Sequence, residues 1–179
     1  MVEVADFDPA VAILLSHEGS AFVPKDAGNA GCVRWGLTQR YVMNTKRALT
    51  WEDAYEYVRA LPQQGAETIY RADFWEHYQL GKIENQQAAT ILFSMLVNQR
   101  PSAAVKALQR ALAELGADIE VDGVLGPVTI AALNSYSWDH LRPIWHDKVE
   151  AHYRNIAPMV DDGKHLKGWL RRADELFKS

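Results

Sequence analysis

Two carboxylates eight residues apart are the clearest candidates for chemistry in this sequence. Glu18 ends the run Leu14-Leu15-Ser16-His17-Glu18, and Asp26 follows in a glycine-rich stretch. Cleavage of a glycosidic bond commonly uses such a pair: one carboxyl protonates the leaving oxygen, and the other activates water or attacks the sugar carbon. Partial burial at the end of an apolar helix favours the protonated form of a carboxyl, which suits a general acid. On the residues alone, a solvated glutamate near a helix end is the competing interpretation.

The elements on either side of Glu18 must position it. Residues 9–17 are predicted to form a helix, with Asp8 as its N-cap and Pro9 in its first turn. Residues 22–37 lack a helical period and are predicted to form a loop or short β-hairpin. Residues 26–31 form its turn-rich middle, and the strand-like positions are Val23, Val33, Trp35 and Leu37.

The rest of the chain is predicted to be helical. Thr50 caps a helix that Pro62 stops, and Pro101-Ser102 opens another. The expected helices cover residues 51–61, 66–78, 85–98, 103–115, 129–134, 138–157 and 164–177. One small β element followed by helices indicates a mainly α fold of the α+β kind, a helical bundle with a small β-hairpin after the first helix.

Composition excludes several classes of function. The net charge is −4 and no basic stripe is present, so nucleic acid is not expected as a partner. The apolar run at residues 11–15 is too short to cross a bilayer, so no integral membrane segment is expected. The first eight residues hold three acids and no Lys or Arg, which is not a signal peptide. We therefore expect synthesis in the cytoplasm.

A family resemblance gives these residues a context. The segment 15–22, with Asp26, Gly28, Gly31 and Gly36-Leu37-Thr38, resembles the start of glycoside hydrolase family 108, which includes phage N-acetylmuramidases and proteins described as secretion activators. Tyr70, Phe74-Trp75 and the segment 93–98 also resemble that family. Residues 104–112 and 121–134 resemble the peptidoglycan-binding-like region that follows its catalytic motif, and 168–172 resemble its closing Gly-Trp-x-x-Arg.

The resemblance implies a lysozyme-like fold and hydrolysis of the β-1,4 bond between N-acetylmuramic acid and N-acetylglucosamine. Glu18 would be the general acid, and Asp26 would position water or stabilise charge on the sugar. The expected substrate-binding residues are Asn29, Trp35, Thr38 and Asn98. Residues 1–101 would form the catalytic region and 102–179 a helical peptidoglycan-binding-like region packed with it, burying Leu108, Leu112, Ile130, Leu133 and Trp169. We expect an endolysin-type monomer that needs no cofactor and acts in the periplasm or cell wall after holin-type release or another export route.

The sequence departs from the family pattern in the hairpin. Counted back from Gly36, the family's threonine falls on Val33, which has no hydroxyl to hold a water molecule. Asn29 is the first candidate to replace it. Two alternatives therefore stay open: a non-catalytic peptidoglycan-binding or secretion-assisting protein with a degenerate site, and a lytic transglycosylase, which needs an acid but no activated water.

The remaining residues that could carry chemistry are predicted to have structural roles. The six histidines show no metal-binding spacing, so no metal site is expected. The single cysteine, Cys32, permits no intrachain disulfide and is predicted to be a small buried residue. Tyr70, Phe74 and Trp75 at helical spacing are predicted to be core, while Trp35 fits a core anchor and a sugar-stacking residue equally well.

Overall fold

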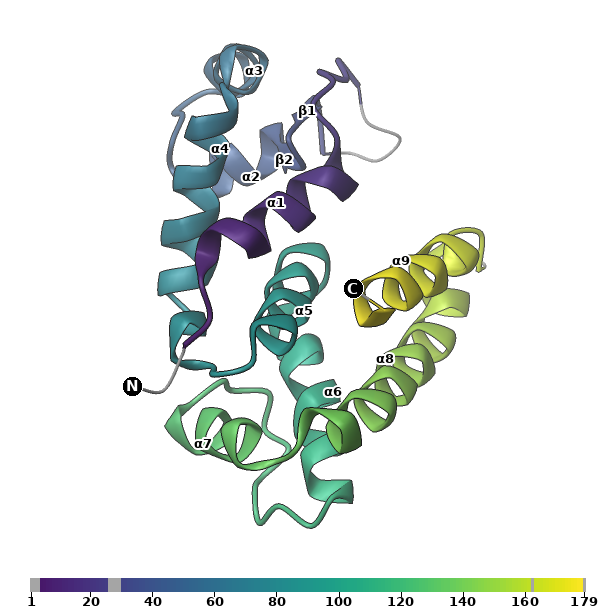
Figure 1. The fold of residues 1–179 in the computed structure, drawn as a ribbon. Helices are drawn as coiled ribbons and strands as arrows, with labels where there is room; N and C mark the ends of the chain where they lie inside the picture. The colour runs from purple at the N-terminus through teal and green to yellow at the C-terminus, as the bar shows by residue number, and fades with distance from the viewer. Residues whose placement is uncertain (1–3, 26–29, 162, 179) are drawn as a thin grey trace. The chain divides into compact units, whose positions relative to one another are not determined.

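The first helix brings Glu18 to its C-terminal end. In the computed structural model, which describes residues 4–25, 30–161 and 163–178, α1 runs over Phe7–Glu18 (Figure 1). Its buried side chains recur on one face: Phe7, Ala10, Val11, Leu14 and Leu15. Gly19 adopts a positive φ of 75° and donates its N–H to the Leu15 carbonyl at 3.1 Å, which ends the helix.

The predicted N-cap of this helix is wrong. Asp8 lies inside the first turn, because the helix already begins at Phe7. The Asp8 carboxylate instead accepts a hydrogen bond from the Arg71 guanidinium at 2.9 Å. An acidic side chain in the first turn also interacts favourably with the helix dipole, so Asp8 stabilises the helix without capping it.

The chain divides into two compact units. The first is Phe7–Asp73, and the second combines Phe74–Ser179 with the N-terminal residues, of which 4–6 are described. The predicted division into a catalytic region, 1–101, and a peptidoglycan-binding-like region packed with it, 102–179, stays a prediction.

A β-hairpin follows α1 in the first unit, as predicted. Strands β1 (Val33–Arg34) and β2 (Leu37–Thr38) pair antiparallel, with Val33 opposite Thr38 and Arg34 opposite Leu37. Trp35 was predicted to be strand-like, and this is wrong: Trp35 and Gly36 form the turn, with φ of 56° and 75°. Positive φ at both central residues is the condition for the hairpin turn that matches strand twist. Val23 extends the pairing through an isolated bridge to Val33.

Three helices complete the first unit: α2 (Gln39–Asn44), α3 (Trp51–Ala60) and α4 (Gln63–Tyr70). The sequence did not predict α2, because six residues are too few to show a helical period. The predicted cap of α3 is confirmed, since the Thr50 side chain accepts the Asp53 N–H at 3.0 Å. Between α2, α3 and the hairpin lies a small core of Cys32, Val42, Ala54 and Val58.

Helix α4 continues into the π-helix η1 (Arg71–Glu76), within which the two units divide. The 3-10 turn η2 (Leu80–Lys82) and helices α5 (Gln86–Asn98), α6 (Pro101–Glu114), α7 (Pro127–Ser135), α8 (Trp138–Asp161) and α9 (Leu166–Lys178) follow. Every residue of α5 from Ala88 to Leu96 is buried, which confirms α5 as a core helix. Helix α8 packs along α6 and α9 (Figure 1).

The predicted core of this region is confirmed except at one position. Leu108 and Leu112 are fully buried, and Ile130 and Leu133 nearly so. Trp169 is only half-buried, because its ring lies against the rings of Tyr153 and His165 on the face of α9 rather than inside the core.

A buried glutamine organises the turn that precedes α7. The Gln109 amide N–H donates to the Asp122 carboxylate at 2.8 Å, and its carbonyl accepts the Gly123 N–H at 2.8 Å. Hydrogen bonds from the Val124 N–H and from Gln109 hold the pKa of Asp122 below its usual range. The predicted Asp122-Gly123 turn is therefore fixed from inside by α6.

None of the described helices combines the length and apolarity that a bilayer crossing requires.

Candidate active site

Glu18 lies against the turn of the β-hairpin. A Cβ atom built on Gly36 would come within 2.8 Å of the Glu18 carboxylate oxygen Oε2 and within 2.7 Å of the Tyr70 hydroxyl. Glycine is therefore required at position 36 for space as well as for its φ of 75°. The hairpin backbone, the half-buried Glu18 side chain and the Tyr70 hydroxyl meet at one point.

Tyr70 supports this point from inside the unit. Its side chain is fully buried, and its hydroxyl donates a hydrogen bond of 2.7 Å to the Trp35 carbonyl in the turn. Burial, and then the charges of Glu18 and Tyr41, raise the pKa of Tyr70 far above its usual range. Tyr70 therefore stays a neutral hydrogen-bond donor at any working pH, and it fixes the turn on which Glu18 rests.

A second polar group lies beside Tyr70. The Tyr41 hydroxyl on α2 donates a short hydrogen bond to the Asp73 carboxylate, and Arg47 donates to the other carboxylate oxygen at 2.7 Å. The side chains of Arg47 and Asp73 are only 23% and 22% exposed, so this pair is better protected from solvent than a surface ion pair. These groups hold α2 against η1.

Trp35 acts as an anchor of the turn. Its indole N–H donates to the Leu61 carbonyl at 3.1 Å, while its own carbonyl accepts from Tyr70. These two hydrogen bonds hold a non-glycine residue in the left-handed region, which costs about 1–2 kcal/mol. The Trp35 ring also lines a cavity of about 460 Å³ beside α1 and α4, with Leu15, Gln63 and Glu67 among its walls. The expected role in substrate binding stays a prediction.

The other predicted site residues are placed as follows. Asp26 and Asn29 lie outside the described residues. The Thr38 hydroxyl accepts the Tyr41 N–H at 3.1 Å as the N-cap of α2. Asn98, in the second unit, donates to the Ser94 carbonyl at 3.0 Å and accepts a short hydrogen bond from Arg172. Thr38 and Asn98 thus have structural partners, and their contact with substrate stays a prediction.

Val33 offers no hydroxyl in place of the family's threonine, and its backbone is already used. Its N–H and carbonyl both pair with Val23, at 2.9 Å each. A polar group that replaces the threonine must therefore come from another residue.

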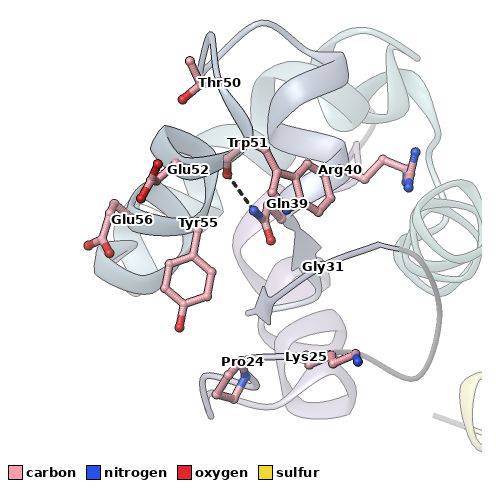
Figure 2. Close-up of a pocket in the computed structure, with 10 residues that line it drawn as sticks. All are labelled: Pro24, Lys25, Gly31, Gln39, Arg40, Thr50, Trp51, Glu52, Tyr55 and Glu56. Carbon is pink, nitrogen blue, oxygen red and sulfur yellow. Dashed lines mark hydrogen bonds between the residues drawn. The ribbon is translucent and has the colours of Figure 1, made fainter.

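The first unit also holds a larger pocket, which sequence reasoning missed. A cavity of about 1050 Å³ opens beside α2 and α3 (Figure 2). Its described lining is Pro24, Lys25, Gly31, Gln39, Arg40, Thr50, Trp51, Glu52, Tyr55 and Glu56. Two aromatic rings four residues apart on one helix were the signal that could have indicated it.

In the second unit, His146, Glu150 and Asp174 come close enough together to suggest metal ligands. Their ligand atoms lie within 4.8 Å of one another. However, His146 pairs with Asp174 at 3.0 Å, and Arg154 approaches Glu150 at 3.4 Å. These contacts within the protein hold the three side chains near one another, and the expected absence of a metal site stays a prediction.

The helices, the hairpin and the glutamate at the end of α1 define a small, mainly helical protein of lysozyme-like fold. Its fold is similar to the structure of Brucella abortus SagA, with a TM-score of 0.77 and 22% sequence identity over 96% of this chain and 91% of that chain. No curated protein sequence matches the chain.

Two family descriptions account for most of the sequence. Residues 11–99 match "Glycosyl hydrolase 108", and residues 103–174 match "Predicted Peptidoglycan domain". The chain belongs to glycoside hydrolase family 108, which confirms the family resemblance of its motifs. It is therefore a glycoside hydrolase by family. The match of residues 103–174 to a peptidoglycan domain supports peptidoglycan as the substrate.

Proposed function

We propose that this protein is an N-acetylmuramidase of the endolysin type, which hydrolyses the β-1,4 bond between N-acetylmuramic acid and N-acetylglucosamine in peptidoglycan. The observation that carries the proposal is the placement of Glu18. It is a half-buried carboxyl at the end of an apolar helix, held against Gly36 of a tyrosine-supported hairpin turn. A fixed, partly desolvated carboxyl is what protonation of a glycosidic oxygen requires.

In this mechanism Glu18 donates its proton to the leaving oxygen as the bond to the sugar carbon breaks. Asp26 positions the attacking water or stabilises the positive charge that develops on the sugar. Tyr70 and Gly36 keep the Glu18 carboxyl in place, and neither takes part in proton transfer. The chemistry requires only carboxyl groups and water, so we propose that it needs no cofactor.

The substrate determines where the protein would act. Peptidoglycan lies outside the cytoplasmic membrane, so we propose that the protein works in the periplasm or cell wall after holin-type release or another export route. The net charge of −4 gives no long-range attraction to an anionic wall. Binding then depends on short-range contacts with sugar and peptide groups.

The decisive test is substitution of Glu18 combined with product analysis. Glu18→Gln keeps the size of the side chain but removes the transferable proton, so lysis of purified sacculi should fall by roughly a hundredfold to ten-thousandfold. Circular dichroism should show an unchanged fold, and sacculi should still pull the protein down. Near wild-type lysis by folded Glu18→Gln would show that the acid lies elsewhere.

Val33 favours a second candidate, a lytic transglycosylase. With no hydroxyl at this position to hold a water molecule, the 6-hydroxyl of N-acetylmuramic acid would attack instead of water. Mass spectrometry of the released muropeptides separates the two reactions, since only the transglycosylase leaves anhydro-muramic ends. A hydrolase should give reducing ends, and Val33→Thr should raise its rate unless another residue of the turn already holds the water.

A further inference from the structure

We infer that the pocket beside α2 and α3 is a second saccharide-binding surface, which holds N-acetylhexosamine rings of the glycan strand against Trp51. The inference rests on the proposed function, because it assigns part of the same glycan to a pocket that Glu18 does not line. We call this pocket the Trp51 pocket; its lining is the set of residues shown in Figure 2.

The Trp51 ring is held in a fixed position. A Cβ atom on Gly31 would come within 2.7 Å of the ring carbon Cζ2 of Trp51, so the indole packs directly on the glycine backbone. Gln39, which is only 2% exposed, donates to the Trp51 carbonyl at 2.6 Å and accepts the Cys32 N–H at 3.0 Å. The buried amide therefore joins the start of α3 to the segment beside Gly31, which keeps the ring orientation constant before any ligand arrives.

The fixed ring is nevertheless open to solvent. Trp51 is 47% exposed, although a large aromatic side chain of this kind is usually mostly buried. Tyr55 follows four residues later on the same face of α3, and its ring lines the pocket as well (Figure 2). An exposed, immobile aromatic ring loses little conformational entropy on binding, as expected of a residue that stacks on a ligand.

The charges around the rings favour a neutral ligand. Among the described lining residues, the two positive charges of Lys25 and Arg40 are balanced by the two negative charges of Glu52 and Glu56. Arg40 also lies 5.8 Å from the centroid of the Trp51 ring, and Glu56 is bound by Arg59 at 2.9 Å. A polyanion would gain no net attraction here. An N-acetylhexosamine ring offers an apolar face to the indole. Its hydroxyl and amide groups can form hydrogen bonds with the polar side chains that line the pocket.

The size of the pocket suits a chain rather than a single ring. A volume of about 1050 Å³ is slightly above the range of about 300–1,000 Å³ that is usual for small-molecule pockets. A polymer such as peptidoglycan presents several identical sugars in succession, so a second contact raises the effective concentration of the glycan near the first unit.

The test uses the full chain carrying Glu18→Gln, so that binding is measured without cleavage. A tetramer of N-acetylglucosamine is titrated by calorimetry into this protein with Trp51 intact or changed to Leu or Tyr. We expect Trp51→Leu to weaken binding by roughly tenfold or more, and Trp51→Tyr to keep most of it, because Tyr retains a flat ring. Tyr57→Leu is the matched control, since Tyr57 is an exposed aromatic residue of the same helix that does not line the pocket.

Each outcome has a defined consequence. Equal binding by Trp51→Leu and Tyr57→Leu would overturn the inference, as would Trp51-dependent binding of the free stem peptide without binding of the sugar tetramer. Unfolding of Trp51→Leu is detected by circular dichroism. In that case Tyr55→Leu, which removes the other aromatic ring of the pocket, is compared with Tyr57→Leu, and equal tetramer affinity of these two variants would overturn the inference. Lysis of sacculi by the wild-type chain is measured in parallel, so loss of the proposed function and loss of this pocket are scored separately.

Discussion

A single methyl group at Gly36 tests how Glu18 is held. The Cβ atom of Gly36→Ala would lie 2.8 Å from the Glu18 Oε2 atom and 2.7 Å from the Tyr70 hydroxyl. Both distances are shorter than van der Waals contact, so both clashes must be relieved. Tyr70 is fully buried and bonded to Trp35, whereas Glu18 is only half-buried at the end of α1, with both its Cγ and its Oε2 atoms 2.8 Å from the new Cβ atom. We therefore expect Glu18 to be displaced further than Tyr70, whose hydrogen bond to Trp35 is strained but retained.

Gly19 provides the matched control. It has the same positive φ of 75°, yet a Cβ atom there meets nothing within 4 Å. Gly19→Ala should therefore cost only the backbone strain of a left-handed alanine, about 1–2 kcal/mol. Gly36→Ala carries the same strain plus the weakened Tyr70–Trp35 hydrogen bond, about 1 kcal/mol more. Both proteins should remain folded.

The two variants should differ far more in activity than in stability. Misplacement of a catalytic group by about 1 Å can cost roughly a hundredfold in rate. Urea unfolding measures the stability difference, and turbidity of sacculi measures lysis by folded protein. If Gly36→Ala lyses sacculi as fast as Gly19→Ala, Glu18 is not held by the turn and the reasoning fails.

Three further predictions concern the supporting structure. Tyr70→Phe leaves the Trp35 carbonyl without its donor, so the free energy of unfolding should fall by about 1–3 kcal/mol and lysis should fall with it; unchanged lysis would exclude a positioning role. Gln109→Leu removes the hydrogen bonds from Gln109 to Asp122 and Gly123, and it should lower the melting temperature more than the same change at Gln64, an exposed glutamine of α4. Because the pKa of Asp122 is lowered in the fold, the stability it contributes is present above its unfolded pKa of about 3.9 and is lost as the pH falls through the folded value; this acid-sensitive part should shrink in Gln109→Leu, and an identical pH profile would contradict the assignment. Truncation after Pro101 separates α5 from α6, which pack together within the second unit, so the fragment should be insoluble; a soluble and active 1–101 fragment would show that the helices after Pro101 are dispensable.

Long periodic elements were predictable from the sequence, and short or strained ones were not. Helix α5 has an unbroken apolar run, and both Thr50 and Pro101 mark helix starts by the chemistry of their side chains. Helix α2 is too short to show a helical period, and the role of Thr38 as its N-cap was not predictable without that helix. A tryptophan at a positive φ breaks the local rules of turn composition, so Trp35 could be placed only after its tertiary hydrogen bonds were known.

The candidate site was predictable in part for the same reason. Glu18 is the last residue of an apolar helix and precedes a glycine, which places it at the helix end. Tyr70 occupies a helical core position, and periodicity alone cannot distinguish a buried ring from one whose hydroxyl reaches a carbonyl 35 residues away. The spacing of Trp51 and Tyr55 indicates a pair of rings on one face of a helix. The pocket around them also depends on Gln39 and Gly31 meeting Trp51, and no local pattern indicates that long-range contact.

Cys32 gives the molecule a built-in reporter of local opening. It is the sole cysteine of the chain, it is fully buried in the small core with Val42, Ala54 and Val58, and burial raises the pKa of its thiol. A thiol reagent can therefore label it only when this part of Phe7–Asp73 opens. The labelling rate under native conditions measures the free energy of opening of the unit Phe7–Asp73. The unit formed by the later helices contains no cysteine, so it gives no signal. Substitutions at Gly36, Tyr70 or Trp51 can thus be assigned to the unit that they disturb without unfolding the whole protein.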